Sequence, residues 1–190
     1  MRGEKQIMQM TFDETKATQI AGKFLKLSGG TLQYLALIKL LYKLDREAIN
    51  RWGLPVTTDK YVSMKLGPVT SNIYNLIKAS NDSSAPTFWS THITRNGYNV
   101  ILTSDPNDTE LSEAEEDLAQ EIFSKDGDKG GFQLADECHK EFPEWEDPGN
   151  SSTPIFIETI LAALGKSEDE WMHSTTSIGA QNTLHAMLAK

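Results

Sequence analysis

The chain has 190 residues, of which 38% are hydrophobic and 24% charged, and its formal net charge is −9 at pH 7. This length suits one domain over residues 1–190, since single domains usually run to roughly 100–200 residues. Cys138 is the only cysteine, which excludes an intramolecular disulfide and leaves a structural zinc site to be built almost wholly from histidines. No apolar run reaches the roughly 20 residues of a membrane span, and the start lacks a secretory pattern. We therefore expect a cytoplasmic protein with no membrane contact and no metal or other cofactor.

The charge is distributed unevenly along the chain. Residues 1–104 carry 13 basic and 7 acidic side chains (net +6), whereas residues 105–190 carry 5 basic and 20 acidic ones (net −15). The acidic half repels phosphate backbones and suits a basic protein partner, while the first half leaves a nucleic-acid contact open. A solvated acidic face that keeps the protein soluble is the alternative explanation. We divide the domain into a helical core, 13–103, and an acidic helical second half, 104–190.

Apolar spacing predicts two helices at the start of this core. Apolar residues recur at intervals of three and four over 13–27, and Gly29 and Gly30 then end the helix. A longer central helix is expected over 31–52, with Gly53 as its C-terminal cap. Asp45 falls inside the apolar stripe of this helix, where an unpaired carboxylate is costly to bury, so it should have a specific partner.

The next segment predicts a winged helix-turn-helix unit over 31–103. We expect a short helix over 57–66, a turn at Gly67 and Pro68, and a second helix starting at 70 or 71. Alternating apolar residues around Asn96 and Gly97 predict a two-residue β-hairpin, which would be the wing. The predicted fold class is therefore mainly α, with a winged-helix-like core of helices plus one hairpin and with flanking and C-terminal helices.

Helical patterns dominate the second half. Ser112 and Glu115 form a capping-box signature before a helix over 114–123, and further helices are expected over 132–142 and, starting at Pro154, over 154–164. A second capping box at 167–170 and a tail helix over 181–188 complete the prediction.

Motifs typical of enzymes are missing. Neither glycine pair has the spacing of a phosphate-binding loop, and no His-x-x-x-His pair suggests a metal site. Cys138 and His139 are consecutive, so on a helix their side chains point about 100° apart and do not form a nucleophile-base pair. We expect no catalytic activity.

Three segments, 34–49, 53–61 and 65–74, contain Lys-Leu-Leu-Tyr-x-x-Asp, then Gly-x-Pro, then Gly-Pro-Val before an Ile-Tyr helix. In this order the segments closely resemble the Panacea domain family, the SocA-like antitoxins of type II toxin-antitoxin pairs. The resemblance covers roughly residues 20–145, and His139 and Trp145 are similar to a His and Trp pair found in the family's second half. The motif residues, for which we expect structural roles, are Lys39, Tyr42, Asp45, Gly53, Pro55, Gly67, Pro68, Val69 and Tyr74.

The resemblance implies an antitoxin that binds and neutralises a protein toxin encoded in the adjacent gene. One family member works as an adaptor that delivers its toxin to a protease, so a protease is a further possible partner, as is a second copy of the chain. The family serves many unrelated toxins with one domain, so variable surface residues must select the partner.

Candidate partner contacts come from three places in the sequence. Asp45 could lie in a partner-binding pocket, although a structural role is also expected for it, with bonds from backbone near the Gly67-Pro68 turn or a pair with Lys39 or Lys65. Trp89, beside a polar loop, could be an exposed aromatic anchor. An acidic run could mask a basic groove on the toxin. This run consists of Glu113, Glu115, Glu116 and Asp117.

The alternative function is that of a winged-helix DNA-binding transcriptional autoregulator. Four residues of the second helix would then enter a major groove, and the hairpin tip would meet phosphate or the minor groove. Because only two of these residues are basic, DNA is a secondary possibility. The candidates are Ser71, Asn72, Asn75, Lys78, Arg95 and Asn96.

Overall fold

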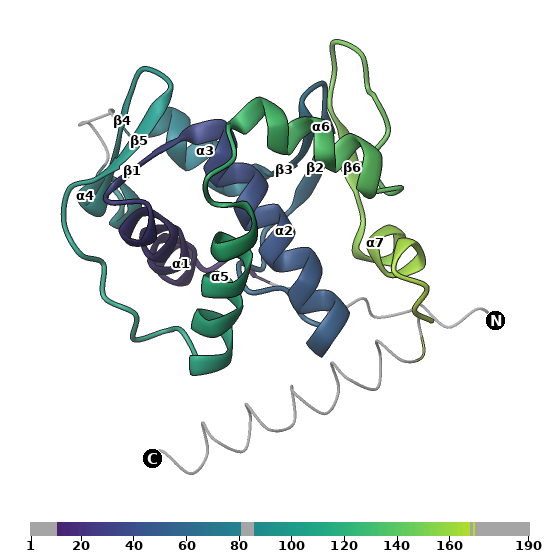
Figure 1. Ribbon diagram of the computed structural model, residues 1–190, viewed down its shortest axis with the longest axis horizontal. Coiled ribbons are helices and arrows are strands. Elements are labelled where there is room, and N and C mark those ends of the chain that lie inside the picture. The colour runs from purple at the N-terminus through teal and green to yellow at the C-terminus, as the bar shows by residue number, and fades with distance from the viewer. Residues whose placement is uncertain (1–10, 81–85, 168, 170–190) are drawn as a thin grey trace.

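The computed structural model describes residues 11–80, 86–167 and 169. They form an α-rich domain with two small antiparallel sheets, in the strand orders β1-β5-β4 and β3-β2-β6 (Figure 1). The elements in chain order are α1 (Glu14–Leu27), β1 (Thr31–Gln33), α2 (Tyr34–Trp52), β2 (Tyr61–Met64), β3 (Gly67–Thr70), α3 (Ser71–Ala79), α4 (Phe88–His92), β4 (Ile93–Asn96), β5 (Asn99–Leu102), α5 (Glu113–Asp126), α6 (Gly131–Glu141), β6 (Thr153–Ile155) and α7 (Ile157–Ala163).

Helix α2 is the centre of the fold, as predicted, with α1, α5 and α6 packed around it (Figure 1). Every residue from 36 to 45 is buried. The predicted start at Thr31 is wrong by three residues, because 31–33 pair as a strand with β5. The end is confirmed: Gly53 has the left-handed φ of 78° that a glycine cap adopts easily. Helix α1 is also confirmed, with Asp13 accepting a hydrogen bond from Lys16 N at 3.0 Å.

The predicted short helix over 57–66 is wrong. Residues 61–64 form β2, which pairs with β3 across a two-residue turn at 65–66. The turn predicted at Gly67 and Pro68 therefore lies two residues earlier, and Gly67, the first residue of β3, has a φ of 95°. Asp59, just before β2, accepts from the backbone N–H groups of Asn72 at 2.8 Å and Ile73 at 3.0 Å, at the start of α3. The winged-helix interpretation is not confirmed, because a strand stands where its first helix was predicted.

The hairpin of β4 and β5 is confirmed, with its two-residue loop at Gly97 and Tyr98, one residue later than predicted. Helix α4, which the sequence did not reveal, begins with a capping box of Thr87 and Ser90 and runs directly into β4. Strand β5 also pairs with β1, so the hairpin is joined to the start of α2.

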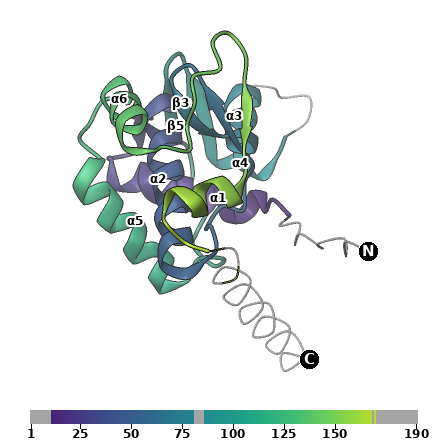
Figure 2. The same cartoon turned by 90° about the vertical axis from the view of Figure 1, so that its right-hand side faces the viewer.

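In the second half, the capping box of Ser112 and Glu115 is confirmed at the start of α5. The prediction that Pro154 starts a helix is wrong, since 153–155 pair with β2 and α7 begins two residues later. Helix α7 packs against α2 (Figure 2). The predicted capping box at 167–170 and the tail helix over 181–188 lie outside the described residues.

The buried residues form two clusters. The larger one joins α1, α2, α3 and α5, and the smaller one surrounds Tyr42, Tyr61, Cys138 and Phe142, where β2, α6 and α7 meet α2. Within the described ranges, no helix combines the length and the apolar character that a bilayer crossing requires.

Candidate functional site

The motif residues of α2 meet the β2-β3 hairpin and α6 in the middle of the domain. Asp45 is fully buried and its carboxylate accepts hydrogen bonds from the backbone N–H groups of Val56 and Thr57, both at 2.9 Å, and from Tyr61 Oη at 2.9 Å. The Thr57 hydroxyl donates to the second carboxylate oxygen. Burial raises the pKa of Asp45 to about 6, against the lowering effect of these bonds. The expected partners near Gly67, Lys39 or Lys65 are wrong: Asp45 fixes the chain that leaves α2.

Lys39 is also fully buried, and its Nζ donates to the Pro68 carbonyl oxygen at 2.6 Å. Pro68 is the second residue of β3, so this bond joins α2 to the β2-β3 hairpin. Desolvation lowers the pKa of Lys39 to about 8. A Cβ on Gly67 would lie 3.0 Å from the same Nζ, so the lysine also explains why a glycine suits this turn.

Tyr42 and Arg46 hold the segment after α6. Both bind the buried carboxylate of Glu144, from Tyr42 Oη at 3.0 Å and from Arg46 Nε at 2.7 Å. Burial, and then Glu144, raise the pKa of Tyr42. The Arg46 guanidinium also lies 4.5 Å from the centre of the Phe142 ring. Residues 142–144 are therefore fixed to α2.

His139 and Trp145, the pair suggested by the resemblance, are in contact. Their rings stack with centroids 3.8 Å apart, and Trp145 Nε1 donates to the Met64 carbonyl at 2.9 Å. His139 Nε2 is buried without a hydrogen-bond partner among the described residues. Burial and the positive charge of Lys39 lower the pKa of His139. The stack closes the β2-β3 hairpin against α6.

The other motif residues lie nearby in the same framework. Gly53, Pro55, Gly67, Pro68 and Val69 are buried, and Tyr74 is half-buried under the Lys78 amine. Cys138 is fully buried, and desolvation raises the pKa of its thiol to about 11. The motif side chains thus point at one another and at the backbone, and few of them reach the surface.

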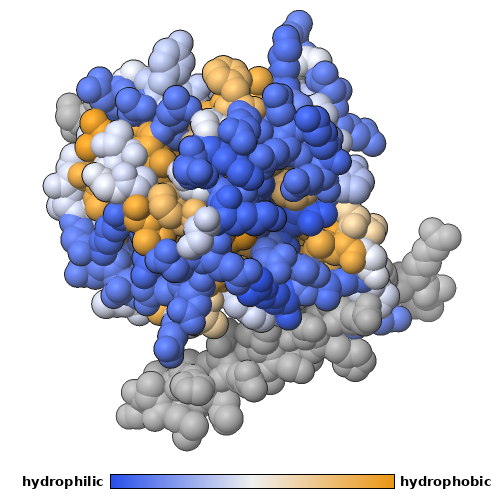
Figure 3. Space-filling view, viewed as in Figure 1, coloured by the Kyte–Doolittle hydropathy of each residue, from blue (hydrophilic) through white to orange (hydrophobic). Residues whose placement is uncertain are grey.

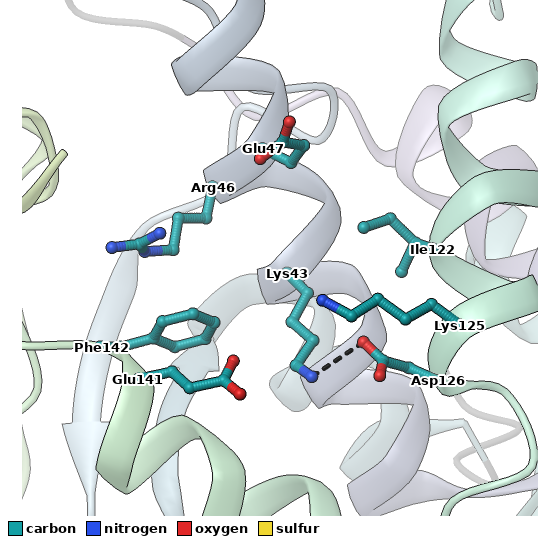
Figure 4. A pocket seen from close by; sticks show the side chains of 8 residues that line it. All are labelled: Lys43, Arg46, Glu47, Ile122, Lys125, Asp126, Glu141 and Phe142. Atoms are coloured by element: carbon teal, nitrogen blue, oxygen red, sulfur yellow. Dashed lines mark hydrogen bonds and ion pairs between the residues drawn. The ribbon is translucent and has the colours of Figure 1, made fainter.

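A small pocket of about 160 Å³ opens between α2, α5 and α6 (Figure 4). Lys43 reaches its floor and donates to Asp126 at 2.8 Å and to Glu137 at 3.1 Å, and Lys129 binds the same two carboxylates. Lys125 and Glu141 stand at its rim. These opposite charges balance one another, and the described residues contain no group of three or more His, Cys, Asp or Glu that could hold a metal ion.

The candidate partner contacts are only partly on the surface. Trp89 is fully buried against α1, with its backbone N–H bound to Glu14 at 2.9 Å, so its prediction as an exposed anchor is wrong. The prediction was wrong because Trp89 belongs to helix α4, which packs against α1, although a polar loop precedes it in the sequence. In the acidic run, Glu115 pairs with a lysine of α1 at 2.7 Å and Glu116 with another at 2.6 Å. The two exposed carboxylates of the run are those of Glu113 and Asp117.

The candidate DNA contacts lie on α3 and the neighbouring β4. Ser71 and Asn72 are half-buried, whereas Asn75, Lys78 and Asn96 are exposed. Both basic groups have partners within the chain. The Lys78 amine lies 4.5 Å from the centre of the Tyr74 ring, and the Arg95 guanidinium lies 4.8 Å from that of Tyr34 and donates to Gly97 O at 2.8 Å.

Two exposed aromatic residues escaped the sequence reading. Tyr98 is 77% and Phe132 69% exposed. Their signals were an aromatic residue inside a two-residue hairpin loop and one directly after a glycine at a helix start.

Comparison with known proteins agrees with the motif geometry. Residues 37–146 match the family described as antitoxin SocA-like, Panacea domain. This range runs from α2 through the stack of His139 and Trp145 and takes in more than half of the chain. No curated protein and no solved structure matches the chain. By its motifs and by the length of the match, the chain belongs to the SocA-like antitoxin family with the Panacea domain.

Proposed function

We propose that this protein is an antitoxin that neutralises a cognate protein toxin by binding it directly. The observation that carries the proposal is the family match over 37–146, which includes every residue of the buried motif framework. An antitoxin family implies a toxin as partner, and the mode of neutralisation is our inference.

The burial of the motif supports binding through other residues. Lys39, Tyr42 and Asp45 are each fully buried, and their polar atoms bind other parts of the chain. Side chains used in this way hold the scaffold and are not available to a partner. Recognition by exposed, variable side chains is what a domain that serves many different toxins requires.

The acidic second half supports a basic partner. Glu113 and Asp117 project from the first turns of α5, and no ion pair to either is found within the described part of the chain. A long-range field of this sign accelerates encounter with a cationic surface, such as the substrate groove of a toxin that acts on RNA or nucleotides. The double charge reversal Glu113→Lys with Asp117→Lys should slow association with the toxin and weaken the salt dependence of the association rate. If the association rate of the wild type does not change with salt concentration, this part of the proposal is wrong.

Co-expression with the product of the adjacent reading frame tests the main proposal. We expect growth inhibition by that product alone, rescue when both are made, and co-purification of a complex. If the product is toxic but is neither bound nor rescued, direct neutralisation is wrong. If it is not toxic and no complex forms, a mobility-shift assay on the protein's own promoter tests the DNA-binding alternative.

Degradation kinetics separate a blocking antitoxin from a protease adaptor. A blocker leaves the toxin's half-life unchanged or longer, because the complex protects it from proteolysis. An adaptor shortens the half-life, and deleting the protease then abolishes rescue. A pulse-chase experiment with and without this protein distinguishes the two.

A further inference from the structure

Two exposed aromatic residues belong to segments that contact the same short stretch of chain, the start of α2. Tyr98 and Phe132 have the largest exposed fractions, 77% and 69%, of the large hydrophobic residues that the structure describes. They come from different elements, the β4-β5 loop and the first turn of α6. We name Tyr98, Phe132 and the residues 33–35 between them the apical surface.

Tyr98 is held in place although it is exposed. Its carbonyl oxygen accepts from Tyr34 N at 2.9 Å, and its ring stacks on the Tyr34 ring with the centroids 6.3 Å apart. The Arg95 guanidinium lies 4.8 Å from the centre of the same Tyr34 ring. An exposed aromatic ring that is already ordered loses little conformational entropy when a partner covers it.

Phe132 is positioned by the glycine that precedes it. Gly131 N donates to Gln33 Oε1 at 3.1 Å, and a Cβ on Gly131 would lie 2.8 Å from Leu35 Cβ. This close approach fixes the first turn of α6 against the start of α2. The ring of Phe132 therefore stands out from a rigid helix end. In Figure 3 a hydrophobic area marks the top of the molecule, in the region where Figure 1 draws the start of α6.

Carboxylates stand on both sides of Phe132 in the chain. Asp136 follows Phe132 by four residues, one turn further along α6, and Asp128 precedes it by four residues, just before α6 begins. Both are exposed, and neither has an ion pair among the residues described. In a symmetric pair of two copies, these like charges would approach each other on chains that each carry −9, which disfavours self-association through this face. A partner with lysine or arginine side chains around an apolar patch would instead be attracted.

We propose that the apical surface is the docking site for the toxin, which inserts an apolar patch rimmed by basic side chains between Tyr98 and Phe132. This rests on the proposed function, and it adds the place and the chemistry of the contact. Ordered aromatic residues ringed by polar groups are the usual anchors of protein-protein interfaces. Because both rings are mostly in solvent, truncating them removes little from the fold itself.

The first test measures the affinity of the purified full chain for the product of the adjacent reading frame by biolayer interferometry. We expect Tyr98→Ala and Phe132→Ala each to weaken binding at least tenfold and the double variant at least a hundredfold, and growth rescue to fail in the double variant. Phe156→Ala is the matched control, since Phe156 is 63% exposed on another part of the surface, next to β6. Thermal unfolding checks that all variants remain folded.

Charge reversal gives a second, independent readout. Asp128→Lys with Asp136→Lys should lower the affinity and its salt dependence more than Glu113→Lys with Asp117→Lys, which makes the same change of charge on α5. If the affinity of the Tyr98 and Phe132 variants stays within threefold of the wild type while the wild type binds and rescues, the apical surface is wrong and the proposed function stands. If the wild-type protein binds no toxin, the proposed function itself fails. A wild-type dimer that dissociates in the double variant would assign the surface to a second copy and overturn the proposal.

Discussion

Replacement of Asp45 should reveal how strongly the chain after α2 depends on one carboxylate. Asp45→Ala leaves the backbone N–H groups of Val56 and Thr57 buried without an acceptor, and both residues are fully or almost fully enclosed. Each such group costs about 1–3 kcal/mol. The gain from no longer burying a carboxylate offsets a part, so we expect a net loss of about 3 kcal/mol of unfolding free energy, a large share of a typical total of about 5–15 kcal/mol.

Asp45→Asn separates the hydrogen bonds from the charge. Its amide oxygen can accept from both backbone N–H groups, while its NH₂ group faces the hydroxyls of Thr57 and Tyr61, which can turn to accept. At pH 7.5 we therefore expect a loss of only about 1 kcal/mol, roughly one net hydrogen bond.

The pH dependence has a definite sign. Burial raises the pKa of Asp45 to about 6 in the folded state, above its unfolded value of about 4. The folded state then binds more protons between these values, so the contribution of Asp45 to stability is largest at low pH and is lost as the pH rises through 6. Relative to Asp45→Asn, the wild type should gain about 1.4 kcal/mol between pH 7.5 and pH 5.

Urea unfolding followed by circular dichroism at both pH values measures all three quantities. The comparison of wild type with Asp45→Asn cancels the other titrating groups, several of which shift in the opposite direction. A loss below about 0.5 kcal/mol for Asp45→Ala, the usual size for a surface substitution, would refute the structural role of the carboxylate. A wild-type advantage that does not change with pH would refute the raised pKa.

Three further changes test the framework around Asp45. Gly67→Ala should lower the unfolding free energy by about 2 kcal/mol in urea, more than Gly97→Ala, because both have positive φ but only the first crowds a neighbour, the Lys39 amine. Burial lowers the pKa of Lys39 to about 8, so the unfolded state binds more protons than the folded state above that pH. Relative to Lys39→Met, the unfolding free energy of the wild type should therefore rise by about 2 kcal/mol from pH 7.5 to pH 9.5. An unfolding free energy that does not change with pH would contradict the burial of Lys39. Trp89→Ala should cost about 3–5 kcal/mol and reduce toxin neutralisation only in proportion to the unfolded fraction seen by thermal melting, whereas lost binding by a fully folded variant would restore Trp89 as a contact.

The sequence predicted best where one local signal fixes one element. The apolar period of α1 and α2, the glycine cap of α2 and the capping box of α5 depend on neighbouring residues only, and each is confirmed. It predicted worst for short segments that owe their form to pairing. Residues 61–64 read equally well as one turn of helix, and they become a strand because β3 and β6 bond to both edges. Pro154 could open a helix by its own geometry, yet the partner strand decides.

The candidate site shows the same division. The motif named a cluster of residues, and Asp45 was correctly singled out as a polar group that needs partners. Its actual donors lie 11 to 16 residues further along the chain, where no local pattern marks them. Trp89 and the two apical aromatic residues were misjudged for a related reason: exposure depends on what the rest of the chain covers.

By itself, the sequence determined that this chain is helix-rich, acidic in its second half and a member of the SocA-like antitoxin family. Periodicity, composition and motif spacing are properties of the chain as written, so they survive without coordinates. Only the tertiary structure decided which side chains are buried and bonded inside the protein and which are exposed to solvent. Burial and hydrogen bonding join residues far apart in sequence, such as Lys39 with Pro68 and Tyr42 with Glu144, and solvent exposure is what remains after those contacts are made.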